Sequence, residues 1–106
     1  MLDFPLKALS RLFAQKNAAY LRYRQDRWLA LDLIDGIWRQ DRAGVCLQAA
    51  RELVDEAAEA ARNPNMGSTA NIDALLRCAA FEPRLTQTIP NDRLDPGVLG
   101  LARGIV

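Results

Sequence analysis

The side chains of this chain that are able to carry out chemistry are few, and none of them forms a recognised catalytic pattern. The sequence contains no histidine, which removes the commonest general base and the commonest metal ligand of proteins. Two pairs of carboxylates remain, Asp32 with Asp35 and Asp55 with Glu59. Spacings of three and four residues place such pairs on one face of a helix, where they are usually solvated. We therefore expect a protein that is not an enzyme and that holds no metal or other cofactor.

The two cysteines are the only strong candidate nucleophiles. Cys46 and Cys78 lie far apart in the sequence and form no CxxC pair, the spacing typical of metal and redox sites. Both stand among small apolar residues in segments that we expect to be helical, so the sequence predicts two buried free thiols. A disulfide between them would require the two helices to abut.

Arginines and aromatic residues near the N-terminus indicate a different chemistry, the recognition of a partner. Residues 1–27 hold six basic and two acidic side chains, although the whole chain has 14 basic against 13 acidic residues and a net charge of +1. Tyr20, Tyr23 and Trp28 alternate with arginines, a composition suited to phosphate contact and base stacking. The near-neutral net charge and the lack of a helix-turn-helix spacing argue against a dedicated nucleic-acid binder. A protein partner is the preferred prediction, and nucleic-acid binding through residues 20–28 is the alternative.

The composition and the apolar spacing predict one all-α domain. The chain has 106 residues, of which 50% are hydrophobic and 25% are charged, as in ordinary globular domains. Apolar residues three and four apart predict helices over about 5–17, 18–39, 45–62 and 69–80, with turns between the last three. Residues 1–82 are thus expected to form a bundle of three to four helices. Residues 83–106 are expected to form an extended arm, in which Asp95-Pro96 either opens a short final helix or frays.

The core of this expected bundle includes residues from every helix. Whether the first two helices are continuous is left open by the sequence. Gly44 is a candidate for left-handed backbone geometry in the turn before the third helix. The predicted core residues are Leu9, Phe13, Leu33, Ile34, Ile37, Leu53, Leu75 and Leu76, and the final helix would carry Val98, Leu99, Leu101 and Ile105.

Two further expectations concern assembly and location. The second expected helix is apolar over more than half of its circumference between Trp28 and Trp38, which predicts a twofold homodimer. The rival interpretation places that helix at the centre of a monomeric bundle. The sequence shows no signal-peptide pattern and no run approaching the ~20 apolar residues of a membrane span, so a cytoplasmic protein with reduced thiols is expected.

A short, histidine-free helical chain rich in alanine, leucine and arginine resembles the small bacterial regulators that act by capturing another protein. The chain is similar in this respect to antiactivators of LuxR-type quorum-sensing transcription factors. The similarity rests on size, composition and the aromatic, arginine-rich segment from Tyr20 to Trp38. It implies that the chain binds a transcriptional regulator and blocks its dimerisation or its DNA binding.

The partner is expected to bind the outer face of the second helix. Trp28 falls on the polar side of that helix and is the expected anchor, because tryptophan and arginine are typical of interface hot spots. The apolar side chains of the arm would add an extended contact. Alternatively, the chain bends near Asn17 and Trp28 packs beneath a neighbouring helix. The expected partner-binding residues are Leu21, Arg24, Arg27, Trp28, Asp32, Asp35, Arg39, Leu85 and Ile89.

Overall fold

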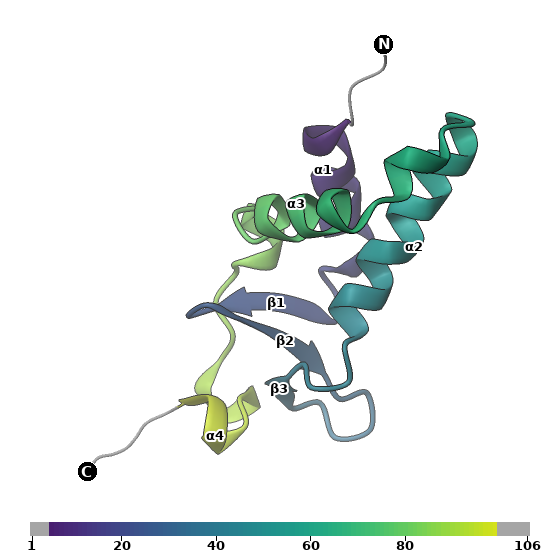
Figure 1. Cartoon of the computed structure of the whole chain (residues 1–106). Coiled ribbons are helices and arrows are strands. Elements are labelled where there is room, and N and C mark those ends of the chain that lie inside the picture. The colour runs from purple at the N-terminus through teal and green to yellow at the C-terminus, as the bar shows by residue number, and fades with distance from the viewer. Residues whose placement is uncertain (1–4, 100–106) are drawn as a thin grey trace.

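A computed structural model describes residues 5–99 and shows three longer helices together with a small sheet (Figure 1). The fold is mixed, so the expected all-α bundle is wrong. Three 3-10 turns lie in the second half of the chain, at Pro64–Gly67, Pro83–Leu85 and Asn91–Arg93. The elements are α1 (Leu6–Asn17), β1 (Leu21–Arg24), β2 (Arg27–Leu31), β3 (Trp38–Gln40), α2 (Val45–Ala60), α3 (Thr69–Ala79) and α4 (Pro96–Leu99).

The expected helix over residues 18–39 is replaced by a three-stranded antiparallel meander in the order β1-β2-β3. A two-residue turn joins β1 to β2. Its residues Gln25 and Asp26 have φ values of 49° and 64°, and two positive φ angles are the geometry that matches the twist of a hairpin. The usual sequence for such a turn is Asn-Gly or Asp-Gly, so the pair found here gave no hairpin signal.

The sheet is covered on both faces, which explains why its central strand was mistaken for part of a helix. Successive residues of a strand point to opposite faces. In β2, Trp28 and Ala30 pack against the helices, whereas Leu29 and Leu31 pack on the other side. Both sets of alternate positions are therefore apolar, and periodicity alone does not distinguish such a run from a buried helix.

The larger core cluster lies between the helices and one face of the sheet. Phe13 of α1, Leu21 of β1 and Leu75 of α3 are fully buried in it. α2 contributes Cys46, Ala50, Leu53 and Val54 to this cluster. Leu85, from the turn after α3, is also fully buried there.

The second cluster lies on the opposite face of the sheet and is closed by the C-terminal segment (Figure 1). Trp38 of β3 pairs with Leu94 in a parallel bridge, and the N–H of Asp95 donates to the Trp38 carbonyl at 2.9 Å. Residues 83–98 are thus packed onto the sheet. Leu85 and Ile89, which the sequence placed in an extended contact with a partner, are both buried within the fold. The cluster consists of Leu29, Trp38, Ile89, Leu94 and Val98, with Leu31 at its edge.

Three of the expected helices are confirmed as α1, α2 and α3. The left-handed conformation of Gly44, with a φ of 78°, and the short helix that begins at Pro96 are confirmed as well. The remainder of that expected final helix, with Leu101 and Ile105, lies outside the described residues. None of the helices in the described part of the chain combines the length and the apolar character needed to cross a lipid bilayer.

The predicted core is correct only where the predicted helices are correct. Its members on α1, α2 and α3 are buried, except that Leu76 is half-buried. Leu33 and Ile34 were predicted as core residues, and this is wrong because 81% and 97% of their surface is exposed. Ile37 is half-buried. The confirmed core residues are Leu9, Phe13, Leu53 and Leu75.

We predict that Leu85→Ala lowers the free energy of unfolding by about 2–5 kcal/mol, because it leaves a cavity in a fully buried site. Ile34→Ala is the matched control and should change it by less than about 0.5 kcal/mol, as is usual for exposed positions. Chemical denaturation followed by circular dichroism measures both. Equal losses for the two variants would contradict the fold described above.

Candidate functional site

The loop between β2 and β3, residues 32–37, presents two adjacent large apolar side chains to solvent. They are Leu33 and Ile34. Both were expected to be buried on the apolar face of a helix, and both are almost completely exposed. Single exposed apolar residues are common on protein surfaces and need no explanation. Two neighbours at the tip of one loop form a small patch that is available to a binding partner.

The loop has a defined conformation because its own polar groups bond to one another. The Asp32 N–H donates to the Ile37 carbonyl at 2.9 Å, and the Gly36 N–H donates to the Asp32 carbonyl at 2.8 Å. The carboxylate of Asp32 accepts the N–H of Ile34 at 2.8 Å, and that of Asp35 accepts the N–H of Ile37 at 2.9 Å. Such bonds from a residue two positions further on are typical of Asx turns. Gly36 adopts a φ of 73°, a left-handed conformation that glycine adopts more easily than residues with a side chain.

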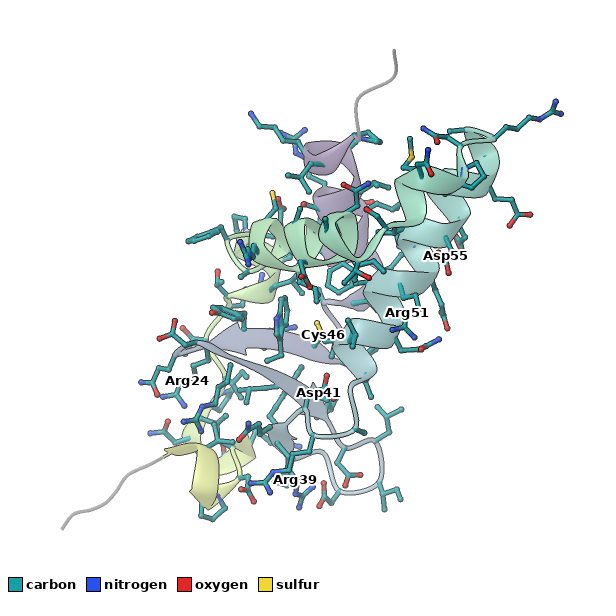
Figure 2. The ribbon with its side chains drawn as sticks, viewed as in Figure 1. Arg24, Arg39, Asp41, Cys46, Arg51 and Asp55 are labelled. Carbon is teal, nitrogen blue, oxygen red and sulfur yellow. The ribbon has the colours of Figure 1, made fainter. Side chains whose placement is uncertain are left out.

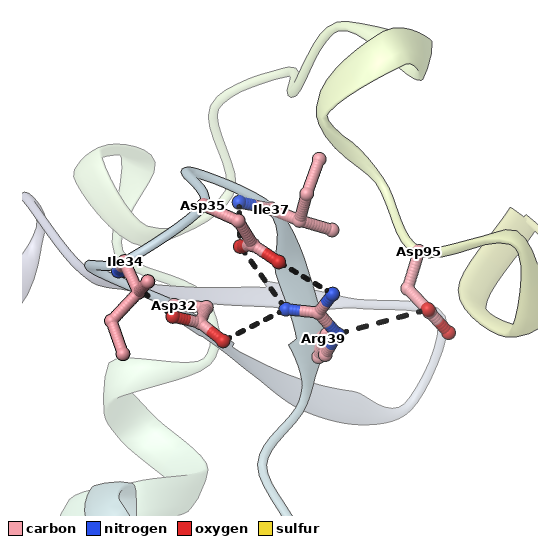
Figure 3. A network of polar contacts seen from close by, with 6 residues as sticks. All are labelled: Asp32, Ile34, Asp35, Ile37, Arg39 and Asp95. Atoms are coloured by element: carbon pink, nitrogen blue, oxygen red, sulfur yellow. Dashed lines mark hydrogen bonds and ion pairs between the residues drawn. The ribbon is translucent and has the colours of Figure 1, made fainter.

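Arg39 of β3 binds carboxylates of the loop (Figure 3). Its Nη1 donates to Oδ2 of Asp32 at 3.0 Å, and its Nη2 donates to Oδ2 of Asp35 at 2.7 Å. Its Nε lies 3.8 Å from Oδ1 of Asp95, which precedes α4. The planar guanidinium thus holds three carboxylates in fixed positions. The expected residues Asp32, Asp35 and Arg39 are brought together, although by a loop and not by a helix.

The ion pair between Arg39 and Asp35 shifts the pKa of both groups. The hydrogen bond from Arg39 is the main reason why the pKa of the Asp35 carboxyl lies below its ordinary value of 3.8, and the bond from the Ile37 N–H acts in the same direction. The pKa of Arg39 is raised, chiefly by its hydrogen bond to Asp35. Asp35 and Arg39 are therefore both charged at neutral pH.

Trp28 does not stand free as the expected anchor. Its ring is half-buried and meets the edge of Phe13 on α1 at a centroid distance of 6.1 Å and that of Tyr23 at 5.1 Å. The chain turns after Asn17 and Trp28 packs beneath α1, as the alternative predicted. Leu21 is fully buried in the same cluster, so it is inaccessible to a partner, whereas Trp28 keeps part of its surface exposed.

The remaining expected residues, Arg24 and Arg27, lie directly opposite each other across the hairpin. They are far from the loop tip along the strands, because they flank the turn at the other end of β2. The nine expected binding residues therefore divide into a loop network, an arginine pair and four apolar residues that are buried or half-buried. The sequence did offer one signal for the loop that was missed, since Asp35-Gly36 is a typical turn dipeptide.

The two cysteines lie on different helices, and Cys46 is at the start of α2 (Figure 2). Cys46 is buried near the start of α2, Cys78 is half-buried on α3, and both are free thiols. Burial, assisted by the neighbouring carboxylate of Asp41, raises the pKa of the Cys46 thiol. Asp41 accepts the N–H groups of Val45 and Cys46 at 2.9 and 2.7 Å, and so caps α2. Within residues 5–99, no group of His, Cys, Asp or Glu side chains is arranged to hold a metal ion.

The lowered pKa of Asp35 predicts an acid-sensitive loop. A carboxyl whose pKa is lower in the folded state stabilises that state above its unfolded pKa, and this contribution is lost as the pH falls through the folded pKa. We expect the amide resonance of Ile37, whose N–H donates to Asp35, to stay constant near neutral pH and to shift with a midpoint below 3.8. Asp35→Asn should remove the shift of Ile37 in the same NMR titration. A midpoint at or above the ordinary value would contradict the network.

The burial of Cys46 predicts a slow thiol. In Cys78→Ser, which retains Cys46 alone, we expect a disulfide reagent such as DTNB to react far more slowly in the native state than after denaturation, because the thiolate is the reacting form. The denatured sample supplies the control for a reactive thiol. Native labelling as fast as denatured labelling would show that Cys46 is accessible.

Comparison of the chain with known protein families, with curated proteins and with solved structures finds no match. The resemblance to antiactivators therefore stays a prediction that rests on size and composition. A functional proposal therefore rests on the geometry of this chain. The most distinctive feature of that geometry is the β2–β3 loop, which exposes Leu33 and Ile34 and is held by Arg39.

Proposed function

We propose that this chain is a non-catalytic protein-binding module that inserts the tip of its β2–β3 loop into an apolar pocket of a partner protein. The observation that carries the proposal is the exposure of Leu33 and Ile34, 81% and 97%, on a loop whose shape is fixed by hydrogen bonds. Each such side chain contributes about 1.5–3 kcal/mol when it is fully buried. A loop that is ordered before binding loses little conformational entropy on binding, which favours affinity.

The charges around the tip indicate the chemistry of the partner. Asp32, Asp35 and Asp95 surround Arg39, and the Arg93 guanidinium lies close to Gly36. Three carboxylates thus face two guanidiniums, and the rim of the apolar tip is acidic. A complementary pocket is apolar at its base and bordered by lysine or arginine. The same acidic rim would be repelled by an anionic lipid surface, because such a surface attracts basic segments.

Such a surface is compatible with the regulatory role that the antiactivator resemblance implies. Capture of a transcriptional regulator, with loss of its dimerisation or DNA binding, stays a prediction about the identity of the partner. The predicted homodimer also stays a prediction. In a homodimer, the loop would bind a second copy of the chain instead of a different protein. The experiment below distinguishes these two outcomes.

The proposal predicts that a photo-crosslinking amino acid at Leu33 captures a distinct protein in the native host. Phe81 is the matched control, because it is a large apolar residue, 84% exposed, at the end of α3. We expect a protein adduct from position 33 and none of the same mass from position 81. An adduct of twice the chain mass would identify a second copy, and a nuclease-sensitive adduct would identify nucleic acid. Either result would overturn the proposed partner.

Affinity for the captured and purified protein then tests the mechanism. The double variant Leu33→Ser/Ile34→Ser should bind it at least tenfold more weakly, since the apolar contribution is removed while the exposed positions leave the fold unchanged. Phe81→Ser should bind as the unmodified chain does. Equal affinities for all three proteins would show that the loop tip is not the docking element.

A further inference from the structure

A second surface, at the opposite end of the β1–β2 hairpin from the loop tip, has a different chemistry. A cavity of about 190 Å³ lies between β1 and the segment that follows the turn Pro83–Leu85. Pockets for drug-sized ligands are larger, about 300–1,000 Å³, so this one suits a small group. Among the described residues, its lining contains two guanidiniums, several hydroxyl and amide side chains and no carboxylate: Arg22, Tyr23, Arg24, Thr86, Gln87, Thr88, Ile89 and Asn91.

The arginines that line the cavity have hydrogen-bonding capacity that the described residues leave unused. Nε of Arg22 and Nη1 of Arg24 are both buried, and neither has an acceptor among residues 5–99. The Arg22 guanidinium is held in place, because its Nη1 donates to the Leu21 carbonyl at 2.9 Å and its carbon lies 5.0 Å from the centre of the Trp38 ring. A buried donor without an acceptor destabilises the fold, and an anion in the cavity would supply the missing acceptors.

The charges of this region are uncompensated as well. Arg24 lies directly across the hairpin from Arg27, and like charges in that position repel each other. Arg22 shares their face of the sheet, because strand residues two positions apart point the same way. In the part of the chain that the structure describes, none of the three forms an ion pair. Burial lowers the pKa of Arg22, as expected for a partly desolvated cation without a counter-ion.

We propose that this cavity binds a phosphate group, with Arg22 and Arg24 as its charged ligands. Guanidinium groups bind phosphate oxygens through paired, charge-assisted hydrogen bonds. Thr88, Gln87 and Asn91 supply neutral donors around them, and their side chains make no hydrogen bond to other described residues. The phosphate belongs either to a free small molecule or to a nucleic-acid strand. The site is independent of the loop tip, so failure of one proposal leaves the other intact.

The test is an NMR titration of the whole ¹⁵N-labelled chain with pyrophosphate as the probe. We expect saturable shifts confined to the amides of residues 22–24 and 86–91. Arg24→Gln should weaken binding at least tenfold, and Arg24→Lys should retain part of the affinity. Arg51→Gln is the matched control, because Arg51 is exposed on α2, away from Arg24 (Figure 2), and its loss changes the net charge equally. That variant should bind within twofold of the unmodified chain.

Three results would overturn the proposal. They are shifts spread over all basic surfaces, equal losses for Arg24→Gln and Arg51→Gln, and the absence of saturation. A ten-nucleotide single strand in the same titration distinguishes the two sources of phosphate. A strand that binds more tightly, depends on Arg24 and displaces pyrophosphate identifies nucleic acid. A strand that fails to displace pyrophosphate identifies a free small molecule.

Discussion

The structure depends on the need to cover both faces of a short, three-stranded sheet. So few strands of three to five residues are not stable in water unless they pack against other elements. The helices cover one face, and the segment after α3 covers the other. Because this segment has little secondary structure of its own, it is held by Ile89, Leu94 and Val98, which insert beside Trp38.

Both candidate surfaces lie where this C-terminal segment meets the sheet. At one end of the hairpin, Asp95 joins the carboxylates around Arg39 and thereby supports the loop. At the other end, residues 86–91 complete the cavity beside Arg22 and Arg24. A segment that was expected to be a separate arm is therefore the part of the chain that shapes both surfaces, through its backbone and its polar side chains.

The helices were predictable from the sequence because each has one apolar face and recognisable ends. Gly44 immediately precedes α2, and Pro83 follows the end of α3. The segment 18–39 was not predictable by the same reasoning. β2 is apolar at both sets of alternate positions, since each face of the sheet is buried, and its turn lacks the glycine that usually marks a hairpin. Only β1, with its alternation from Leu21 to Arg24, carried a strand signal.

The site was predicted in part and for a different geometric reason. Asp32, Asp35 and Arg39 were grouped because helical spacing placed them on one face, and the structure groups them because an arginine satisfies two turn-forming carboxylates. The same helical assumption placed Leu33 and Ile34 in the core, although the turn directs them outward. Leu85 and Ile89 were placed in an exposed arm, whereas Leu85 is buried in the helical cluster and Ile89 in the cluster on the second face of the sheet.

The two-sided cover of the sheet has a consequence for spectroscopy. Each side holds one of the two tryptophans: Trp28 lies beside Phe13 in the helical cluster, and Trp38 lies with Leu94 in the C-terminal cluster. Their indole fluorescence therefore reports on different halves of the molecule. In single-tryptophan variants, Trp38 emission would follow the docking of the C-terminal segment, and Trp28 emission would follow the helices. Coincident unfolding curves from the two would define the chain as one cooperative unit, and separated curves would resolve two.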